Sequence, residues 1–207
     1  MNAAASTGLI VFAKAPVPGH VKTRLIPALG AAGAADLAAR LLDHAVTAGI
    51  AAAFDVIELC TAPDASHPAF AGLAAQHPSL QVTVQGDGDL GARMDRALAR
   101  RLASCDGVLL IGTDAPALDA AMLRAAAQAL RTHDAVFVPA HDGGYALVGL
   151  TSPQPLLFAG PTWSTSSVMA ETRARARHAN LRWAELPAVA DIDEPADLAH
   201  LPPGWQR

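Results

Sequence analysis

The segment "GLIVFAKAPVPGHVKTRL", residues 8–25, joins a short apolar run to a loop that is rich in Pro and Gly. An apolar run of this length, built from Leu, Ile, Val and Phe, is typical of a β-strand that is buried on both faces. The loop holds both lysines of the chain, Lys14 and Lys22, although Lys and Arg together number 15. The segment therefore predicts a buried strand that ends in a positively charged loop.

Similar apolar runs recur along the chain, at residues 55–61, 80–85, 107–113, 134–140 and 145–150. Helical patterns lie between most of them, most clearly in residues 37–45 and 90–102, where large apolar residues recur at every fourth position. This alternation predicts an α/β fold, a three-layer α/β/α sandwich with a mostly parallel sheet. No shift in composition marks a second domain, so we expect residues 1–207 to form one domain.

The composition argues against several classes of protein. The net charge is −4 and charges of both signs are mixed along the chain, so no basic surface for nucleic acid is expected. Cys60 and Cys105 are too few for a disulfide framework and favour a reducing compartment. The N-terminal apolar run is too short for a signal peptide or a membrane span. We therefore expect a cytoplasmic protein with neither a nucleic acid nor a membrane as its partner.

Polar loops follow several of the predicted strands. They contain the sequences "GDGDLGARM" (86–94), "TDAP" (113–116), "HDGGY" (141–145) and, near the C-terminus, "DIDEPADL" (191–198). In open α/β sheets, ligands bind beyond the carboxyl ends of the strands. We therefore expect these loops and the basic loop to meet at one edge of the sheet. Ordinary loop composition would also supply Asp, Gly and Pro.

The basic loop resembles a phosphate-binding P-loop but does not match its pattern. A P-loop requires Gly directly before the Lys-Thr pair, and Val21 stands there instead. The compact charge of lysine and the planar fork of arginine nevertheless suit a polyphosphate. The residues predicted to bind nucleotide phosphates are Lys14, Lys22, Thr23 and Arg24. The alternative is that they are solvated loop charges.

Two carboxylates form a predicted metal site. Asp114 follows a buried strand directly, and Asp193 of "DIDEP" supplies a second oxygen ligand. Mg²⁺, or Mn²⁺ in its place, commonly binds one or two carboxylates together with substrate phosphates. The alternatives are that Asp114 caps a helix or forms an Asx turn, and that Asp191 and Asp193 cap a short helix after Pro195. The choice between Asp191 and Asp193 as the ligand stays open. There is no G-x-S-x-G motif that would indicate a serine hydrolase.

Six segments together resemble the DUF2064 family, also called rSAM/selenodomain-associated transferase 1, in the order in which that family carries them. The segments are "FAKAPVPGHVKTRL", "GDLGARM", "IGTDAP", "PAHDGGYALVGL", "WSTSSV" and "DIDEPADL". The family belongs to the GT-A (nucleotide-diphospho-sugar transferase) superfamily. The chain is more distantly similar to molybdenum-cofactor guanylyltransferases and 2-phospholactate guanylyltransferases.

This resemblance implies roles for individual residues. Lys22 and Arg24 would hold the donor phosphates, and Arg93 would reach the nucleotide. Asp114 and Asp193 would hold the metal. The acceptor side would be formed by Asp142, Gly143, Gly144, Tyr145 and Trp163, the last as a ring on which a ligand stacks. In two respects the chain departs from the nucleotidyltransferases. They usually carry a Gly-rich loop that ends in Arg-Met directly after the first strand, where this chain has Pro-Val-Pro-Gly, and its sole Arg-Met pair, Arg93-Met94, lies far downstream.

The sequence therefore predicts a metal-dependent transferase that uses a nucleotide and a small-molecule acceptor. Its predicted catalytic residues are Lys22, Asp114 and Asp142, with Asp142 as the base if the acceptor is a hydroxyl. We expect nucleotidyl transfer from a nucleoside triphosphate to a phosphorylated or hydroxyl acceptor. Glycosyl transfer from a nucleotide sugar is the alternative reaction, and a non-catalytic nucleotide-binding protein is the alternative of another class.

Overall fold

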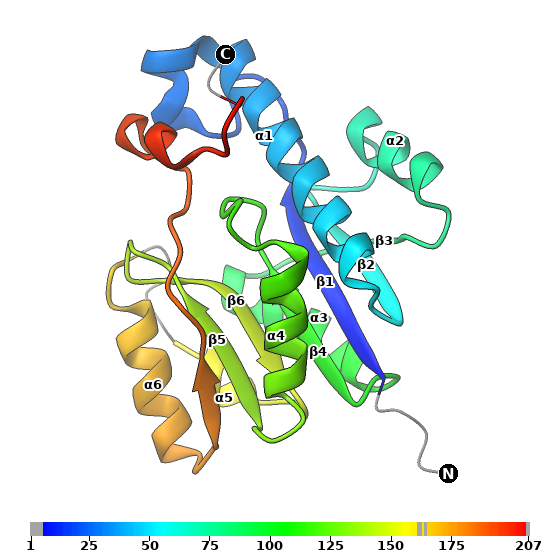
Figure 1. Ribbon diagram of the computed structural model, residues 1–207, viewed down its shortest axis with the longest axis vertical. Helices are drawn as coiled ribbons and strands as arrows, with labels where there is room; N and C mark the ends of the chain where they lie inside the picture. Colours follow the sequence, from blue (N-terminus) through cyan, green and yellow to red (C-terminus); the bar gives the residue numbers. More distant parts are fainter. Residues whose placement is uncertain (1–5, 161–162, 164, 206–207) are drawn as a thin grey trace.

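The structure is a computed structural model that describes residues 6–160, 163 and 165–205. In this part of the chain a seven-stranded sheet has the order β3-β2-β1-β4-β6-β5-β7 (Figure 1). Only β6 runs antiparallel to its neighbours, β4 and β5. The strands are β1 (Thr7–Lys14), β2 (Val56–Ala62), β3 (Gln81–Val84), β4 (Gly107–Ile111), β5 (Ala135–Pro139), β6 (Tyr145–Leu150) and β7 (Trp183–Glu185).

Helices cover both faces of this sheet, which confirms the predicted three-layer sandwich. Alternate residues of β1 face opposite sides, so that Leu9 and Val11 belong to one core cluster and Ile10 and Phe12 to the other. The first face is covered by α1 (Ile26–Ala52), α2 (Pro68–Gln76) and α4 (Ala120–Ala129). The second face is covered by α3 (Leu90–Leu102), α5 (Pro155–Phe158) and α6 (Val168–His178).

Each apolar run predicted as a strand overlaps one to within a few residues, and the helical pattern of residues 90–102 coincides with α3. Asp89 caps this helix, since its side chain accepts a hydrogen bond of 2.8 Å from Ala92 N. The pattern of residues 37–45 marks only the centre of α1, in which Gly30 has a non-helical backbone (φ 72°). Strand β7 was not predicted, because three residues that pair with β5 alone leave no apolar run in the sequence.

Helix α1 and the turn before it form an apolar helical segment, Thr23–Ala52, that is long enough to span a membrane by length and composition. In the fold this helix packs against β1, β2, α2 and α4. Its residues Leu42 and Val46 belong to the first core cluster, and Leu37 and Leu41 belong to a third one. Packing inside the sandwich therefore accounts for part of its apolar composition, since 33 % of its most apolar window is buried.

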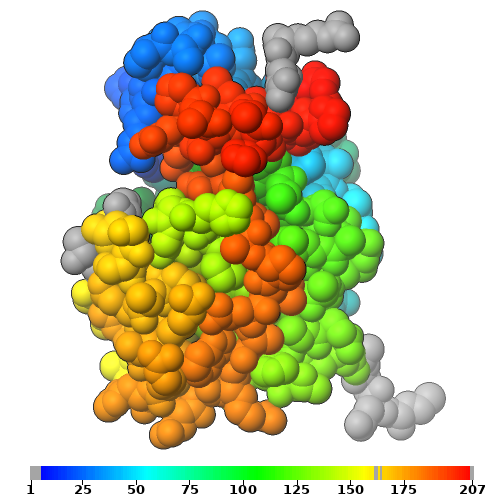
Figure 2. Space-filling model, turned by 60° about the vertical axis from the view of Figure 1, so that its left-hand side comes forward, coloured from blue at the N-terminus to red at the C-terminus, as the bar shows by residue number. Residues whose placement is uncertain are grey.

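The third core cluster joins the two ends of the chain. Leu25 and the first half of α1 pack there against Ile192 and Leu201. Two short 3₁₀ helices, η1 (Thr23–Leu25) and η2 (Pro195–His200), flank this contact. Figures 1 and 2 show the C-terminal segment lying beside the start of α1. This packing places the basic loop next to the "DIDEP" sequence, although the two are far apart in the amino-acid sequence.

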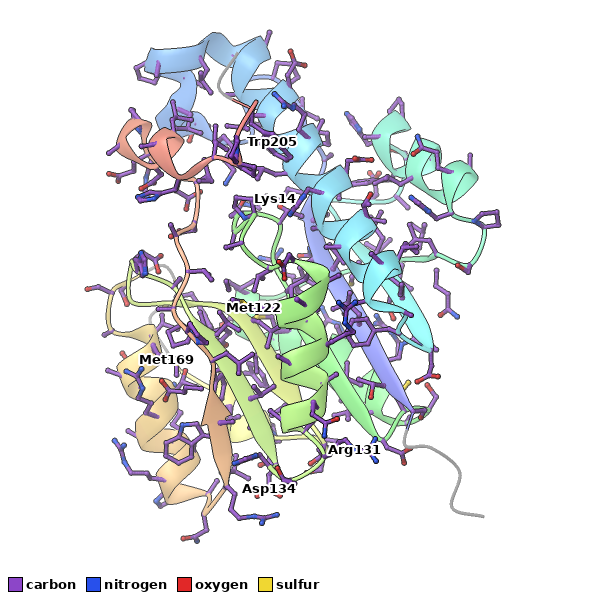
Figure 3. All side chains as sticks on the ribbon, in the orientation of Figure 1. Lys14, Met122, Arg131, Asp134, Met169 and Trp205 are labelled. Carbon is purple, nitrogen blue, oxygen red and sulfur yellow. The ribbon has the colours of Figure 1, made fainter. Side chains whose placement is uncertain are left out.

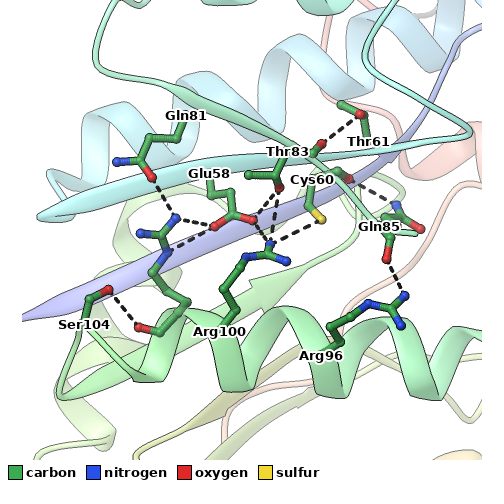
Figure 4. A network of polar contacts seen from close by, with 10 residues as sticks. Glu58, Cys60, Thr61, Gln81, Thr83, Gln85, Arg96, Arg100 and Ser104 are labelled. Atoms are coloured by element: carbon green, nitrogen blue, oxygen red, sulfur yellow. Dashed lines mark hydrogen bonds and ion pairs between the residues drawn. The ribbon is translucent and has the colours of Figure 1, made fainter. Parts of the chain in front are cut away.

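Besides the apolar core clusters, the structure has a buried ionic network between α3 and the strands β2 and β3 (Figure 4). Glu58 on β2 is 0 % exposed and forms ion pairs with Arg100 and Arg101. Thr83 Oγ1 donates a hydrogen bond of 2.6 Å to Glu58 Oε1. Burial alone would raise the pKa of Glu58, but the hydrogen bonds from Thr83 and Arg101 and the charge of Arg100 lower that pKa below its usual value. The neighbouring Cys60 is buried and free, as is Cys105.

We expect Glu58→Gln to lower the free energy of unfolding by about 3 kcal/mol at pH 7, because it leaves the two arginines without their buried partner. The folded pKa of Glu58 is depressed, so its contribution is present above the unfolded pKa and is lost as the pH falls through the lower folded value. The difference between wild type and variant should therefore shrink below about pH 4. Urea unfolding at several pH values measures both effects.

Glu185→Gln is the control, since Glu185 pairs with Arg173 at a partly exposed position, whereas Glu58 is fully buried. That variant should lose only about 1 kcal/mol or less. Equal free energies of unfolding of the two variants at pH 7 would show that the buried Glu58 network stabilises the fold no more than the partly exposed Glu185 pair does.

Candidate active site

Four of the five predicted loops meet at one end of the sheet, beyond the carboxyl ends of β1, β4 and β5; the loop of residues 86–94 is not among the four. The C-terminal segment crosses these strand ends, and two backbone hydrogen bonds fix it there. Ile192 N donates to Asp114 O at 2.8 Å, and His141 N donates to Val189 O at 3.0 Å. As a result, the loops after three strands and the "DIDEP" sequence form one surface.

Lys22 lies at the centre of this surface. Its Nζ donates to Asp193 Oδ1 at 2.9 Å and to Ile192 O at 2.7 Å, and it forms an ion pair with Asp114. The Lys22 side chain is only 6 % exposed. Burial alone would lower the pKa of Lys22, but the charges of Asp114 and Asp193 raise that pKa above its usual value. Lys22 is therefore a buried cation whose partners are the two carboxylates predicted to bind metal.

Neither carboxylate caps a helix. Asp119, not Asp114, caps α4, and it accepts a hydrogen bond of 2.8 Å from Met122 N. At the start of η2 the capping groups are Glu194 and Asp197. The capping roles considered for Asp114 and Asp193 were therefore wrong. The side chains of these two residues remain 48 % and 42 % exposed, so both can be reached from solvent.

The carboxylates of Asp114 and Asp193 could supply some, but not all, of the ligands that a divalent cation needs. Two carboxylates that share one cation are the usual protein contribution to a magnesium site that is completed by phosphate oxygens. Within the described residues, no group of three or more His, Cys, Asp or Glu side chains could hold a metal ion alone. The arrangement therefore suits a metal that arrives with a phosphate ligand, and it does not form a complete metal site by itself.

A cavity of about 340 Å³ opens beside Asp193, the carboxylate partner of Lys22 that belongs to its lining. Burial raises the pKa of Asp191, and the nearby charges of Asp142, Asp193 and Asp197 raise it further. The cavity is therefore strongly acidic. Its lining residues are Arg24, His141, Asp142, Ala190, Asp191, Asp193, Glu194, Asp197 and His200.

The other residues predicted to bind nucleotide have no ion pair with Asp114 or Asp193 in the described part of the chain. Thr23 and Arg24 are exposed at the start of η1, where Arg24 lies 3.8 Å from Glu194. Lys14 is exposed at the end of β1 (Figure 3). Arg93 Nη1 donates to Gln85 Oε1 at 3.2 Å.

Gln85 is a buried residue that the sequence analysis missed. Its Nε2 donates to Cys60 O at 3.1 Å and to Ala13 O at 3.4 Å, so it ties the loop after β3 to the ends of β2 and β1. Arg96 Nη2 in turn donates to Gln85 O at 2.6 Å and to Asp87 O at 2.7 Å. The signal in the sequence was a polar residue directly after a strand and before "GDGD".

Most residues predicted for the acceptor side do not line the acidic cavity. Asp142 does, and its Oδ1 accepts a hydrogen bond of 2.8 Å from Gly144 N. Tyr145 packs instead on Phe137 in the second core cluster, with 5.8 Å between ring centroids, and burial raises its pKa. Trp163 packs against Gly91 of α3. Acceptor contacts by Gly143, Gly144, Tyr145 and Trp163 therefore stay predictions.

Comparison with known proteins identifies the family. A family model described as an uncharacterized protein conserved in bacteria, DUF2064, matches residues 45–165. The chain belongs to the DUF2064 family. The crystal structure of a Desulfovibrio desulfuricans G20 protein, provisionally named a nucleotide-diphospho-sugar transferase, matches this DUF2064 member with a TM-score of 0.84. The two chains are 31 % identical, and the match covers 92 % of this chain and 84 % of the other.

More distant crystal structures share the fold of this DUF2064 chain. CMP:2-keto-3-deoxy-manno-octonic acid synthetase, complexed with CTP, matches 95 % of this chain and 96 % of its own at 10 % identity and a TM-score of 0.61. Rv0371c of Mycobacterium tuberculosis H37Rv, complexed with manganese, matches 96 % of this chain and 98 % of its own at 18 % identity and a TM-score of 0.57. None of the curated proteins matches the sequence. The name of the Desulfovibrio desulfuricans relative supports the prediction of a transferase.

We expect Gly143→Ala to destabilise the loop that carries Asp142. Gly143 has φ +93°, and a Cβ there would collide with the backbone of Ser166. The strained backbone alone costs about 2 kcal/mol. Thermal or urea unfolding measures the loss.

Gly72→Ala is the matched control, because a Cβ at Gly72 in α2 meets open space. That variant should be more stable than wild type by about 0.5–1 kcal/mol, as alanine is the better helix former. A Gly143→Ala protein as stable as wild type would show that this loop can adopt another conformation at no cost.

Proposed function

We propose that this DUF2064 protein is a metal-dependent transferase that moves a nucleotidyl group from a nucleoside triphosphate to a small acceptor. The observation that carries the proposal is the buried Lys22 ammonium held between Asp114 and Asp193, at the strand ends and beside an open cavity. Structural neighbours that are named as a nucleotide-diphospho-sugar transferase and a nucleotidyl transferase support the reaction class, as does the CTP bound by CMP:2-keto-3-deoxy-manno-octonic acid synthetase. We further propose that the whole chain acts as one catalytic unit, since loops from both halves build this surface.

Asp114 and Asp193 would hold Mg²⁺ or Mn²⁺ together with the phosphates of the nucleotide. The bound ion would offset the phosphate charge and orient the α-phosphate. Lys22 and the exposed Arg24 would neutralise the remaining charge, and the Thr23 hydroxyl is available for a further phosphate contact. Positioning and electrostatic stabilisation of this kind provide most of the rate acceleration in phosphoryl chemistry. The manganese complex of Rv0371c supports a divalent cation in this fold.

The charge of the cavity favours a hydroxyl acceptor over a phosphorylated one. Its lining has five carboxylates against one arginine and two histidines, so the excess of negative charge would repel an acceptor phosphate there. Asp142 is exposed at the cavity, and only its Oδ1 accepts a hydrogen bond from Gly144. In the proposed step the acceptor oxygen bonds to the α-phosphorus while the bond to the bridging oxygen breaks. Pyrophosphate leaves, and the hydroxyl proton passes to Asp142.

Glycosyl transfer from a nucleotide sugar is the second proposed function. The observation in its favour is the provisional name of the Desulfovibrio desulfuricans relative, a nucleotide-diphospho-sugar transferase. The product distinguishes the two reactions, because nucleotidyl transfer releases pyrophosphate and glycosyl transfer releases a nucleoside diphosphate. A protein that binds nucleotide and forms neither product over a panel of hydroxyl acceptors would instead be a non-catalytic binder.

We expect Asp114→Asn to abolish the joint stabilisation by nucleotide and metal. In the wild type, a nucleotide with Mg²⁺ at about 100 times its dissociation constant should add about 2.7 kcal/mol to the free energy of unfolding. Each component alone should add much less, because two carboxylates leave Mg²⁺ short of its six oxygen ligands. Thermal unfolding over a panel of nucleoside triphosphates and nucleotide sugars, with and without metal, measures this coupling.

Asp119→Asn is the matched control from the same loop. Asp119 caps α4, and asparagine caps a helix about as well as aspartate, so this variant should keep the full joint effect. Joint stabilisation that survives in Asp114→Asn would contradict the metal site. If no nucleotide stabilises the wild type under any condition, nucleotide use itself is ruled out.

A further inference from the structure

Lys22 and a divalent cation need the same oxygen atoms. The ammonium contacts Oδ1 of Asp114 and Oδ1 of Asp193, and these two residues are the metal ligands of the proposed function, on which this inference rests. A metal ion bound between the two carboxylates would stand at the place of the ammonium. The two cations would also repel each other at that separation.

We propose that, in the protein without nucleotide, the Lys22 ammonium occupies the position at which the metal ion would bind. The site would then accept the metal–nucleotide complex but not the free metal ion. In the free protein Lys22 neutralises one of the two carboxylate charges. Displacing it with a free metal ion would leave a nearly buried ammonium without an anionic partner, which is costly. Displacing it with a metal–nucleotide complex gives the ammonium a phosphate as its new partner.

The backbone at Lys22 is fixed, so the proposed exchange of partners is a movement of the side chain alone. The Lys22 backbone is left-handed (φ 46°, ψ 41°), and its carbonyl accepts a hydrogen bond of 2.8 Å from Leu25 N at the start of η1. Leu25 itself is fully buried in the third core cluster. The four-carbon stem of lysine is flexible enough to exchange a carboxylate partner for a nearby phosphate.

The first test measures Mn²⁺ binding to the full chain in the absence of nucleotide. Lys22→Met keeps the apolar stem and removes the competing charge. We expect this variant to bind Mn²⁺ at least about ten-fold more tightly than the wild type, because the ammonium no longer repels the ion. Arg131→Met is the control, since it removes one positive charge at the opposite end of the sheet (Figure 3) and should leave the affinity unchanged. Equal Mn²⁺ affinity of folded Lys22→Met and wild type would overturn the proposal.

The second test uses the wild type, so it does not depend on the folding of a variant. Lys14 and Lys22 are the only lysines of the sequence, so a protein labelled with ¹⁵N in lysine gives two side-chain ammonium resonances. We expect Mg²⁺ alone to leave the Lys22 resonance in place and Mg²⁺ with a nucleoside triphosphate to shift it. If the Lys22 resonance does not shift when the protein is saturated with Mg²⁺ and nucleoside triphosphate, Lys22 stays paired with Asp114 and Asp193. That result would overturn the proposal.

The two tests separate this inference from the proposed function. If no nucleotide binds, the proposed function fails, and the Mn²⁺ affinity of Lys22→Met alone then decides whether Lys22 and the metal compete. If the metal–nucleotide complex binds but neither the affinity nor the resonance changes, the proposed function stands and the exchange of partners by Lys22 is wrong.

Discussion

The contact of one buried ammonium with two carboxylates is the interaction on which the active surface depends. Lys22 comes from the loop after β1, Asp114 from the loop after β4, and Asp193 from the C-terminal segment. These three segments have no strand pairing with one another at this point. The charges of Lys22, Asp114 and Asp193, together with the backbone hydrogen bond from Ile192 N to Asp114 O, hold together the loops from which the proposed site is built. Because the ammonium is almost completely buried, removing either carboxylate leaves a charge that is poorly compensated.

Apolar packing supports this contact from behind. The backbone of Ile192 contacts both of the other segments. Its N–H donates a hydrogen bond to Asp114 O, and its carbonyl accepts one from Lys22 Nζ. Its side chain is fully buried against Leu25 and the first half of α1. The polar and apolar contacts of a single residue thus fix the C-terminal segment over the strand ends. The proposed site is consequently coupled to the third core cluster, which lies outside the two faces of the sheet.

The sequence alone predicted the layers of the fold because buried strands and amphipathic helices leave periodic patterns, as in β1 and α3. It did not predict β7, which has three residues and no apolar run, or the extent of α1, whose first turns are dominated by Ala and Gly. The meeting of the loops could be predicted from the strand ends. The side-chain contacts could not be, since Lys22 and Asp193 are 171 residues apart and nothing in the local sequence records their pairing.

The structure also explains why a chain that otherwise uses arginine has a lysine at position 22. An ammonium group has three N–H donors and no acceptor. At this position three acceptors surround it, namely the carboxylates of Asp114 and Asp193 and the carbonyl of Ile192. Each donor therefore has one partner, which a buried cation requires. The five donors of a planar guanidinium would exceed these acceptors and would need a wider space. A compact cation that fills the gap between two carboxylates is also the kind of group that a metal ion can replace.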